Sequence, residues 1–185
     1  MRIFGLVAVL LVSFYTLYAF TMSYDINYTI LNKIDSVEIR KYPKLIYASY
    51  QSPTEGSSAQ FRVLANYIFG GNDRQEKIGM TSPVNMPISS NKNEMLFLMP
   101  KRYSIEDLPK PNSPEIKLLN IEERTVAALR FSGYANPNKV QNIKKQLIQI
   151  LEKNNIQYHN KFELLVYDSP YKILNRRNEV IVVLK

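Results

Sequence analysis

Few side chains of this chain could carry out covalent or metal chemistry. It has no Cys and a single His, His159. The lack of Cys excludes a disulfide framework, a thiolate zinc site and a Cys nucleophile. One His cannot supply a two-His metal site within one chain. Any metal would therefore need carboxylate, Tyr or Met ligands, or a cofactor that brings its own ligands.

The remaining candidates for catalysis fail on spacing. Ser57 and Ser58 have neither a neighbouring His nor a Gly-x-Ser-x-Gly turn, and the glycines form no phosphate-binding loop. Glu122 and Glu123 are adjacent, and adjacent strand residues point to opposite faces of a sheet. The sequence therefore predicts no enzyme, no catalytic residue and no protein-derived metal site.

The charge and the aromatic content favour a binding role. Lys and Arg number 24 against 16 Asp and Glu, which gives a net charge of +8, and the chain contains 13 Tyr and 8 Phe. A positive domain attracts anionic partners. The basic pairs, Lys101-Arg102 and Arg176-Arg177, are too short for the stripe of a nucleic-acid surface. They are expected at solvated hairpin ends, and no nucleic-acid partner is predicted.

The N-terminal segment differs from the rest of the chain. Residues 3–20 carry no charge and would span about 27 Å as an α-helix, close to the thickness of a bilayer core. Arg2 precedes them, and the positive-inside rule places it in the cytoplasm with the remainder outside. Residues 1–23 are predicted to be a cleaved signal peptide or a retained membrane anchor, with a buried core helix as a third reading. The body is then extracytoplasmic: periplasmic or secreted after cleavage, and otherwise tethered to the membrane.

Residues 24–185 read as one domain built from two repeats, about 24–100 and 114–185. The halves align at a spacing of about 84, and chance similarity of short apolar strands is the alternative. The matched stretches are Val37-Glu38-Ile39-Arg40 with Ile121-Glu122-Glu123-Arg124, 45–50 with 128–134, and 93–98 with 178–183. Each half reads strand, helix, strand, strand. The pattern predicts an α+β domain of eight antiparallel strands and two helices, with a pseudo-two-fold axis and a sheet that could curl into a barrel.

The two predicted helices differ in how much apolar surface they carry. The second begins at the cap Asn136 and runs to about Lys153, with an apolar stripe wide enough for one core face. The first runs from about 58 to 69, and Val63, Tyr67 and Phe69 widen its apolar arc beyond that face. The surplus would suit a ligand, a membrane or another subunit. Alternatively, loops at 88–94 or 100–114 cover it.

Three separated stretches resemble the SOUL haem-binding protein family over about residues 24–185. They are Val37-Glu38-Ile39-Arg40-Lys41-Tyr42, then Lys77-Ile78-Gly79-Met80-Thr81-Ser82-Pro83-Val84, then Tyr167-Asp168-Ser169-Pro170-Tyr171-Lys172 with Asn175-Arg176-Arg177-Asn178-Glu179-Val180. The resemblance implies a distorted eight-stranded antiparallel β-barrel with two flanking helices. It also implies reversible, non-catalytic binding of haem or another tetrapyrrole.

The resemblance further implies a shallow apolar cleft between the first helix and the loop before the last strand. The corresponding positions here are Arg62, Val63, Asn66 and Tyr67 on the helix, and Tyr171 and Lys172 across the cleft. Val63 and Tyr67 are expected against the porphyrin face, and Arg62 on a propionate. Arg176 and Arg177 are expected either at a solvated hairpin end or fixing the loop through backbone or Glu179. No axial iron ligand is assigned to His159.

Three functions stay open at this stage. The first is a tetrapyrrole carrier or scavenger of the cell envelope. The second is a binding module for other hydrophobic or amphiphilic molecules, because similar duplicated folds serve as effector-binding domains. The third is an interaction protein that uses the apolar face of the first helix. The oligomeric state is not predicted.

Overall fold

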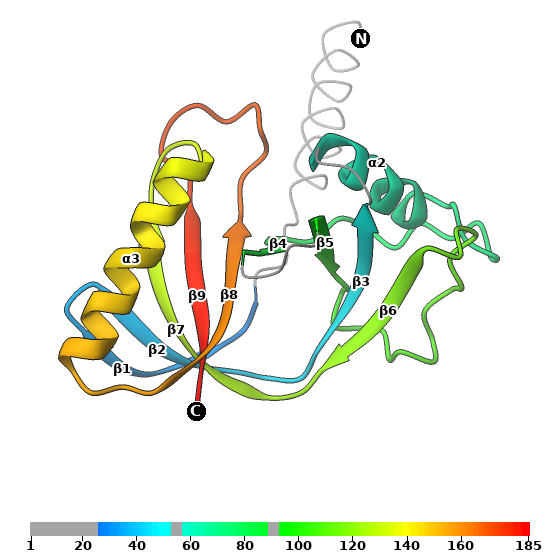
Figure 1. Ribbon diagram of the computed structural model, residues 1–185. Helices are drawn as coiled ribbons and strands as arrows, with labels where there is room; N and C mark the ends of the chain where they lie inside the picture. Colours follow the sequence, from blue (N-terminus) through cyan, green and yellow to red (C-terminus); the bar gives the residue numbers. More distant parts are fainter. Residues whose placement is uncertain (1–25, 53–56, 89–92) are drawn as a thin grey trace, which may run out of the picture.

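The computed structural model describes residues 26–52, 57–88 and 93–185 (Figure 1). The predicted signal or anchor at 1–23 lies outside these residues. The described part contains nine strands and two helices. They are β1 (Thr29–Ile34), β2 (Val37–Tyr42), β3 (Leu45–Ser52), α2 (Ser57–Ile68), β4 (Val84–Pro87), β5 (Asn93–Leu98), β6 (Ile116–Ile121), β7 (Arg124–Phe131), α3 (Pro137–Lys153), β8 (Tyr158–Val166) and β9 (Asn178–Leu184).

All nine strands of the described residues form one antiparallel sheet in the order β1-β2-β7-β9-β8-β4-β5-β3-β6. The expectation of an α+β fold with two flanking helices is correct. The eight-stranded barrel is wrong, because β1 adds a ninth strand beside β2 and does not pair with β6, so the sheet stays open. Strands β1 and β6 are the two edges of the sheet, and no hydrogen bonds between them close it into a barrel.

The internal repeat is present, and in each half one further strand precedes the expected strand-helix-strand-strand unit. The halves run β2-β3-α2-β4-β5 and β6-β7-α3-β8-β9. The predicted match of Val37-Glu38-Ile39-Arg40 to Ile121-Glu122-Glu123-Arg124 is wrong, because the first run lies in β2 and the second crosses the turn from β6 to β7. The spacing is 79 residues from Leu45 to Arg124 and 85 from Asn93 to Asn178, so one constant spacing could not align both ends.

Strand pairing ties the halves together at three places. Strand β2 pairs with β7, β6 pairs with β3, and β4 pairs with β8 at the centre of the sheet. Outward from the β4–β8 pair, the strands on one side are equivalent to those on the other: β9 to β5, β7 to β3 and β2 to β6. The predicted pseudo-two-fold axis therefore runs between these two strands.

Each helix covers the outer face of its own half of the sheet (Figure 1). Leu147 and Leu151 of α3 pack with Phe162 and Val180, and Leu64 and Ile68 of α2 join a second core. A third core lies on the opposite face and takes residues from both halves, including Tyr47, Leu98, Ala128, Leu165 and Ile181. The strands alternate between these cores because successive side chains point to opposite faces.

Both helices begin and end close to the predicted bounds. The side chain of Asn136 caps α3 by accepting a hydrogen bond from Lys139 N at 2.9 Å. After α2 the chain turns at Gly70, whose φ of 115° a residue with a Cβ rarely adopts. Within the described ranges no helix is long and apolar enough to cross a membrane.

Candidate functional site

Helix α2 presents part of the predicted site to solvent. Arg62 and Asn66 are exposed, and Val63 is half-buried against the α2 core. Arg62 forms no hydrogen bond or ion pair with the described residues. The side chain of Asn66 lies close to Gly71, where a Cβ would collide with it. The helix thus presents an exposed guanidinium and an exposed amide to solvent.

Tyr67, in contrast, is a core residue. It is fully buried, and its hydroxyl donates to the Pro109 carbonyl at 2.9 Å. Burial, with the nearby charge of Asp73, raises the pKa of Tyr67 to about 12. The connection from β5 to β6 (residues 99–115) covers this side of the helix, with Leu108 buried against it. The alternative prediction, that the 100–114 loop covers the apolar surface of the helix, is therefore confirmed for Tyr67, whose ring does not reach the surface.

Two aromatic rings on and just after α2 stay partly uncovered. Phe61 is 38% exposed while its ring packs edge-on against Phe97, with the centroids 5.2 Å apart. Phe69, just after the last turn, is 58% exposed. The predicted surplus of apolar surface thus exists, but at these two rings and not at Tyr67.

The second part of the predicted site is the β8–β9 loop (residues 167–177), which is folded around Arg176. This side chain is buried, and its Nη1 donates to the carbonyls of Ser169 and Lys172 at 2.8 Å each. Its guanidinium lies 4.7 Å from the ring centroid of Tyr134. The expectation that Arg176 fixes the loop through backbone is confirmed, and its placement at a solvated hairpin end is wrong.

The outer side of this loop carries the predicted residues Tyr171 and Lys172. Tyr171 is 90% exposed, and its neighbours Ile173 and Leu174 are 72% and 76% exposed. Lys172 is half-exposed and forms an ion pair with Asp168 at 2.6 Å. The loop therefore combines a bare apolar tip with a lysine that already has a carboxylate partner.

Beneath the loop lies a buried charge network that the sequence analysis did not assign. Glu179 of β9 is fully buried and accepts from Arg40 Nη1 at 2.7 Å and Arg40 Nη2 at 3.1 Å. It also accepts from Tyr167 Oη at 2.8 Å and Arg177 Nη2 at 3.1 Å. Burial acts to raise the pKa of Glu179, but hydrogen bonds and charges from Arg40, followed by Arg177, hold it below its usual value. The expected contact of Arg177 with Glu179 is confirmed.

This network joins the stretches that carry the family resemblance. Arg40 belongs to the first stretch, and Tyr167 and Glu179 to the last. Ser82 of the middle stretch donates to the Tyr167 carbonyl at 3.3 Å. A sequence signal was available for Glu179, because it is the one charged side chain of β9 and stands directly before an apolar run. Buried charges survive only when they are paired.

A second buried ion pair closes the centre of the sheet. Arg124 of β7 forms a bidentate pair with Glu163 of β8, and Asn85 of β4 donates to Glu163 Oε2 at 2.7 Å. These three strands come from both halves of the repeat. Together with Asn85, the pair therefore links strands of both halves at the centre of the sheet.

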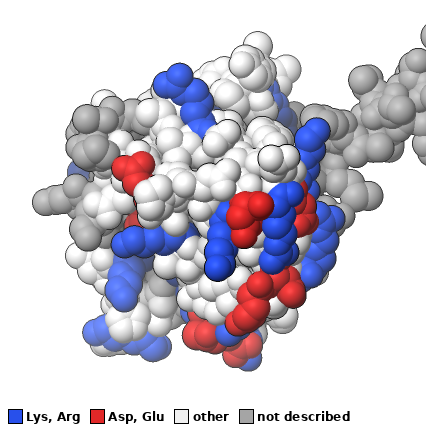
Figure 2. Space-filling view, turned by 90° about the vertical axis from the view of Figure 1, so that its right-hand side faces the viewer, with Lys and Arg blue, Asp and Glu red and all other residues white. Residues whose placement is uncertain are grey.

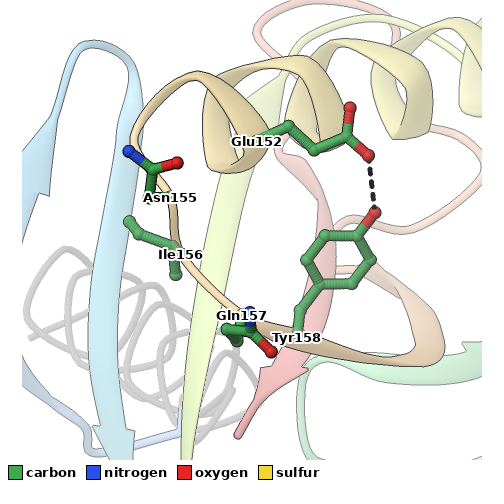
Figure 3. A pocket seen from close by; sticks show the side chains of 5 residues that line it. All are labelled: Glu152, Asn155, Ile156, Gln157 and Tyr158. Carbon is green, nitrogen blue, oxygen red and sulfur yellow. Dashed lines mark hydrogen bonds between the residues drawn. The ribbon is translucent and has the colours of Figure 1, made fainter.

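Two hollows in the described residues lie away from α2. One, of 340 Å³, is a surface crevice in the turn from α3 to β8, where Tyr158 Oη donates to Glu152 Oε1 at 3.3 Å (Figure 3). Another, of 170 Å³, is lined by the charged groups around Arg40 and Glu179. Neither joins α2 to the β8–β9 loop, although both elements stand at the same end of the molecule (Figure 1).

Metal and nucleic-acid sites find no support in the described part of the chain. It contains no group of three His, Asp or Glu side chains placed to hold a metal ion. His159 is exposed near the start of β8, about 23 Å along the strand from the β8–β9 loop at ~3.3 Å per residue. On the face shown in Figure 2, Lys and Arg alternate with Asp and Glu instead of forming one basic patch.

Comparison with known proteins identifies related sequences and folds. The family model described as SOUL heme-binding protein matches residues 24–183. Heme-binding protein 2 of Homo sapiens is 31% identical over 162 residues, covering 81% of this chain and 78% of that protein. Heme-binding protein 1 of Bos taurus is 31% identical over 125 residues, covering 63% of this chain and 64% of that protein.

Solved structures show the same fold at low sequence identity. The C-terminal domain of EcmrR is 12% identical with a TM-score of 0.60, covering 85% of this chain and 98% of that one. A hydrolase from Listeria innocua is 11% identical with a TM-score of 0.59, covering 84% and 94%. At these identities the likeness concerns the fold alone.

Proposed function

Because the chain belongs to the SOUL heme-binding protein family, we propose that it is a non-catalytic tetrapyrrole carrier or scavenger. The observation that carries this proposal is the pairing of the bare apolar tip of the β8–β9 loop with free or exchangeable basic side chains. A porphyrin is a flat apolar ring with two propionates, and it needs both kinds of contact.

In this proposal both α2 and the β8–β9 loop contact the porphyrin ring and its propionates. Tyr171 packs on the porphyrin ring from the loop, and Val63 meets it from the helix. Arg62, which has no partner among the described residues, binds one propionate, and Asn66 donates a neutral hydrogen bond. Lys172 binds the second propionate after its ion pair with Asp168 breaks. Tyr67 supports the helix from inside and leaves the ligand surface to its neighbours.

The residues present fit a porphyrin held by packing and charge. A porphyrin face of several hundred Å², buried at about 25 cal/mol per Å², contributes several kcal/mol before the cost of association. No described His, Asp or Glu cluster stands ready for the iron, and His159 lies at the far end of β8. Reversible binding follows, in which the bound haem or other tetrapyrrole is cargo and metal-free porphyrins compete for the same site.

We further propose that the carrier works in the cell envelope. The uncharged stretch at 3–20 with Arg2 before it supports export, and retention of this stretch would tether the domain to the membrane. The net charge of +8 favours dianionic porphyrins over neutral apolar cargo.

A titration of the protein with haemin and with protoporphyrin IX tests the proposal. Soret absorbance is followed for the wild type, for Arg62→Gln with Lys172→Gln, and for Lys41→Gln with Lys44→Gln, a control that also removes two positive charges but from exposed residues outside the proposed site. We expect one equivalent of either ligand to bind, with affinity lowered at least about tenfold in the double variant and unchanged in the control. Binding of haemin alone, abolished by His159→Ala, would make iron ligation the mechanism instead. Equal binding in all variants would remove the propionate roles, and no saturable binding would refute the carrier.

A further inference from the structure

The tip of the β8–β9 loop exposes more apolar surface than a solvated turn requires. Tyr171, Ile173 and Leu174 stand within four consecutive residues, and each exposes more than two thirds of its surface. The loop projects beyond the ends of β8 and β9 (Figure 1). The porphyrin contact proposed above uses Tyr171 and assigns no role to the two aliphatic side chains.

The loop holds these side chains outward by its own bonds. Arg176 fills the inside of the loop and binds the carbonyls of Ser169 and Lys172. Asp168 accepts from the backbone N–H of Arg177 at 2.6 Å and closes the base. With a charged side chain at its centre, the loop has no apolar interior into which Ile173 and Leu174 could turn. Their exposure is therefore built into the fold.

The charge of the loop indicates the kind of surface that it meets. Beside the tip, Lys172 is half-exposed and can exchange its partner Asp168 for an anionic headgroup, whereas Arg176 is buried and Arg177 is bonded to Glu179. An apolar tip with a lysine beside it suits the interface of a bilayer with anionic headgroups, where a Lys near the surface adds to the attraction.

The start of the described chain lies at the base of this loop. Tyr28 accepts a hydrogen bond from Arg177 Nη2 at 3.4 Å, and its ring lies 4.1 Å from the guanidinium of Arg40. Only residues 21–25 separate Ile26 from the uncharged stretch at 3–20. Five residues and their flanking bonds reach at most about 20 Å. A membrane that holds the stretch is thus within reach of the loop.

We propose that the apolar tip formed by Tyr171, Ile173 and Leu174 docks onto the surface of a bilayer containing anionic lipid, beside the point where the N-terminal segment enters it. This contact goes beyond tetrapyrrole binding and does not depend on it. Docking holds the β8–β9 loop against the membrane, so that a ligand leaving the lipid phase meets the protein at this loop.

The absence of Cys permits a direct test on the full chain. Leu174→Cys in the loop and Leu31→Cys on β1 each give one labelling site, and Leu31 is a matched control because it is also an exposed leucine. In the view of Figure 1, β1 lies at the end of the molecule opposite the loop. Each variant carries an environment-sensitive NBD label and is reconstituted, without porphyrin, into vesicles of phosphatidylcholine with 30% phosphatidylglycerol, roughly the anionic content at which basic segments bind.

We expect the label at 174 to shift to the blue and to be quenched by lipids that carry a nitroxide near the headgroup, while the label at 31 stays as in water. Adding Ile173→Asp to the chain labelled at 174 should abolish the quenching, whereas adding Ile30→Asp should leave it intact. A label at 174 that stays in water, or equal quenching at 174 and 31, would overturn the proposal. A response at 174 to haemin but not to vesicles would also overturn it, and would leave the tetrapyrrole site standing.

Discussion

Replacing Glu179 by glutamine keeps the shape of a fully buried side chain but removes its charge. Arg40 then loses the carboxylate that it binds through both terminal nitrogens, and it keeps only Glu38, whose Oε2 lies 2.9 Å from Arg40 Nη2. Breaking a buried pair in this way costs about 3–5 kcal/mol. Since Glu38 remains as a counter-ion and Tyr167 can still donate to the amide oxygen, we expect a loss of about 3 kcal/mol in the free energy of unfolding.

Urea unfolding of wild type and Glu179→Gln measures this loss, and thermal unfolding should show a midpoint lowered by about 6–12 °C for a chain of this size. Glu122→Gln is the matched control, because Glu122 pairs with Lys44 at 3.2 Å while 75% exposed. Exposed pairs contribute little, so the control should stay within about 0.5 kcal/mol of wild type.

The same comparison has a defined pH dependence. The folded state holds the pKa of Glu179 below its ordinary value of 4.5, so its stabilisation is complete above pH 4.5 and is lost as the pH falls through the lower, folded-state pKa. The difference between wild type and Glu179→Gln should therefore shrink in acid. A loss under about 1 kcal/mol at pH 7, or a difference that persists unchanged at pH 2, would refute the assignment of Glu179 as the ionised centre of the network.

Gly71→Ala should lower the free energy of unfolding by about 1–3 kcal/mol, because its Cβ would collide with the side chain and the carbonyl of Asn66; urea unfolding measures this. Tyr67→Phe should cost about 1 kcal/mol by leaving the Pro109 carbonyl without its donor, while Soret titration shows unchanged porphyrin affinity. Because the pKa of Tyr67 is raised to about 12, its stabilisation is complete below pH 10 and is lost as the pH approaches 12; a phenolate step at 295 nm near pH 12 should be missing in Tyr67→Phe. Arg176→Met should free the β8–β9 loop, and hydrogen exchange of its amides should accelerate at least about tenfold while β9 stays protected.

Much of the fold could be predicted because it follows from local pattern. Asn136 before a proline marks the start of α3, and Gly70 after Phe69 marks the end of α2. The open sheet could not be predicted, because the edge position of β1 depends on which strands pair across the halves. Its sequence, Thr29–Ile34, is mostly exposed and lacks the apolar run that marked the other strands.

The candidate site was only partly predictable for a related reason. Helical spacing places Tyr67 beside Val63 and on the edge of the apolar arc, but spacing does not show that Pro109, 42 residues later, covers its hydroxyl. Likewise, Arg40 and Glu179 are 139 residues apart in the sequence. They come together because β2 and β9 each pair with β7, one on either side. The bare tip of the β8–β9 loop depends on Arg176 folding inward, which composition alone does not reveal.

The place of β9 in the sheet sets the order in which the polypeptide can fold as it is made. Of the described strands this one is synthesised last, yet it lies between β7 and β8 and supplies Glu179 to Arg40. Until residues 178–184 have left the ribosome, α3 has no complete sheet to pack on and the guanidinium of Arg40 has no buried partner. Long-range pairing of this kind delays folding until β9 has been made. If the chain is exported as proposed, it would thus stay unfolded enough to pass a translocation channel until that strand emerges.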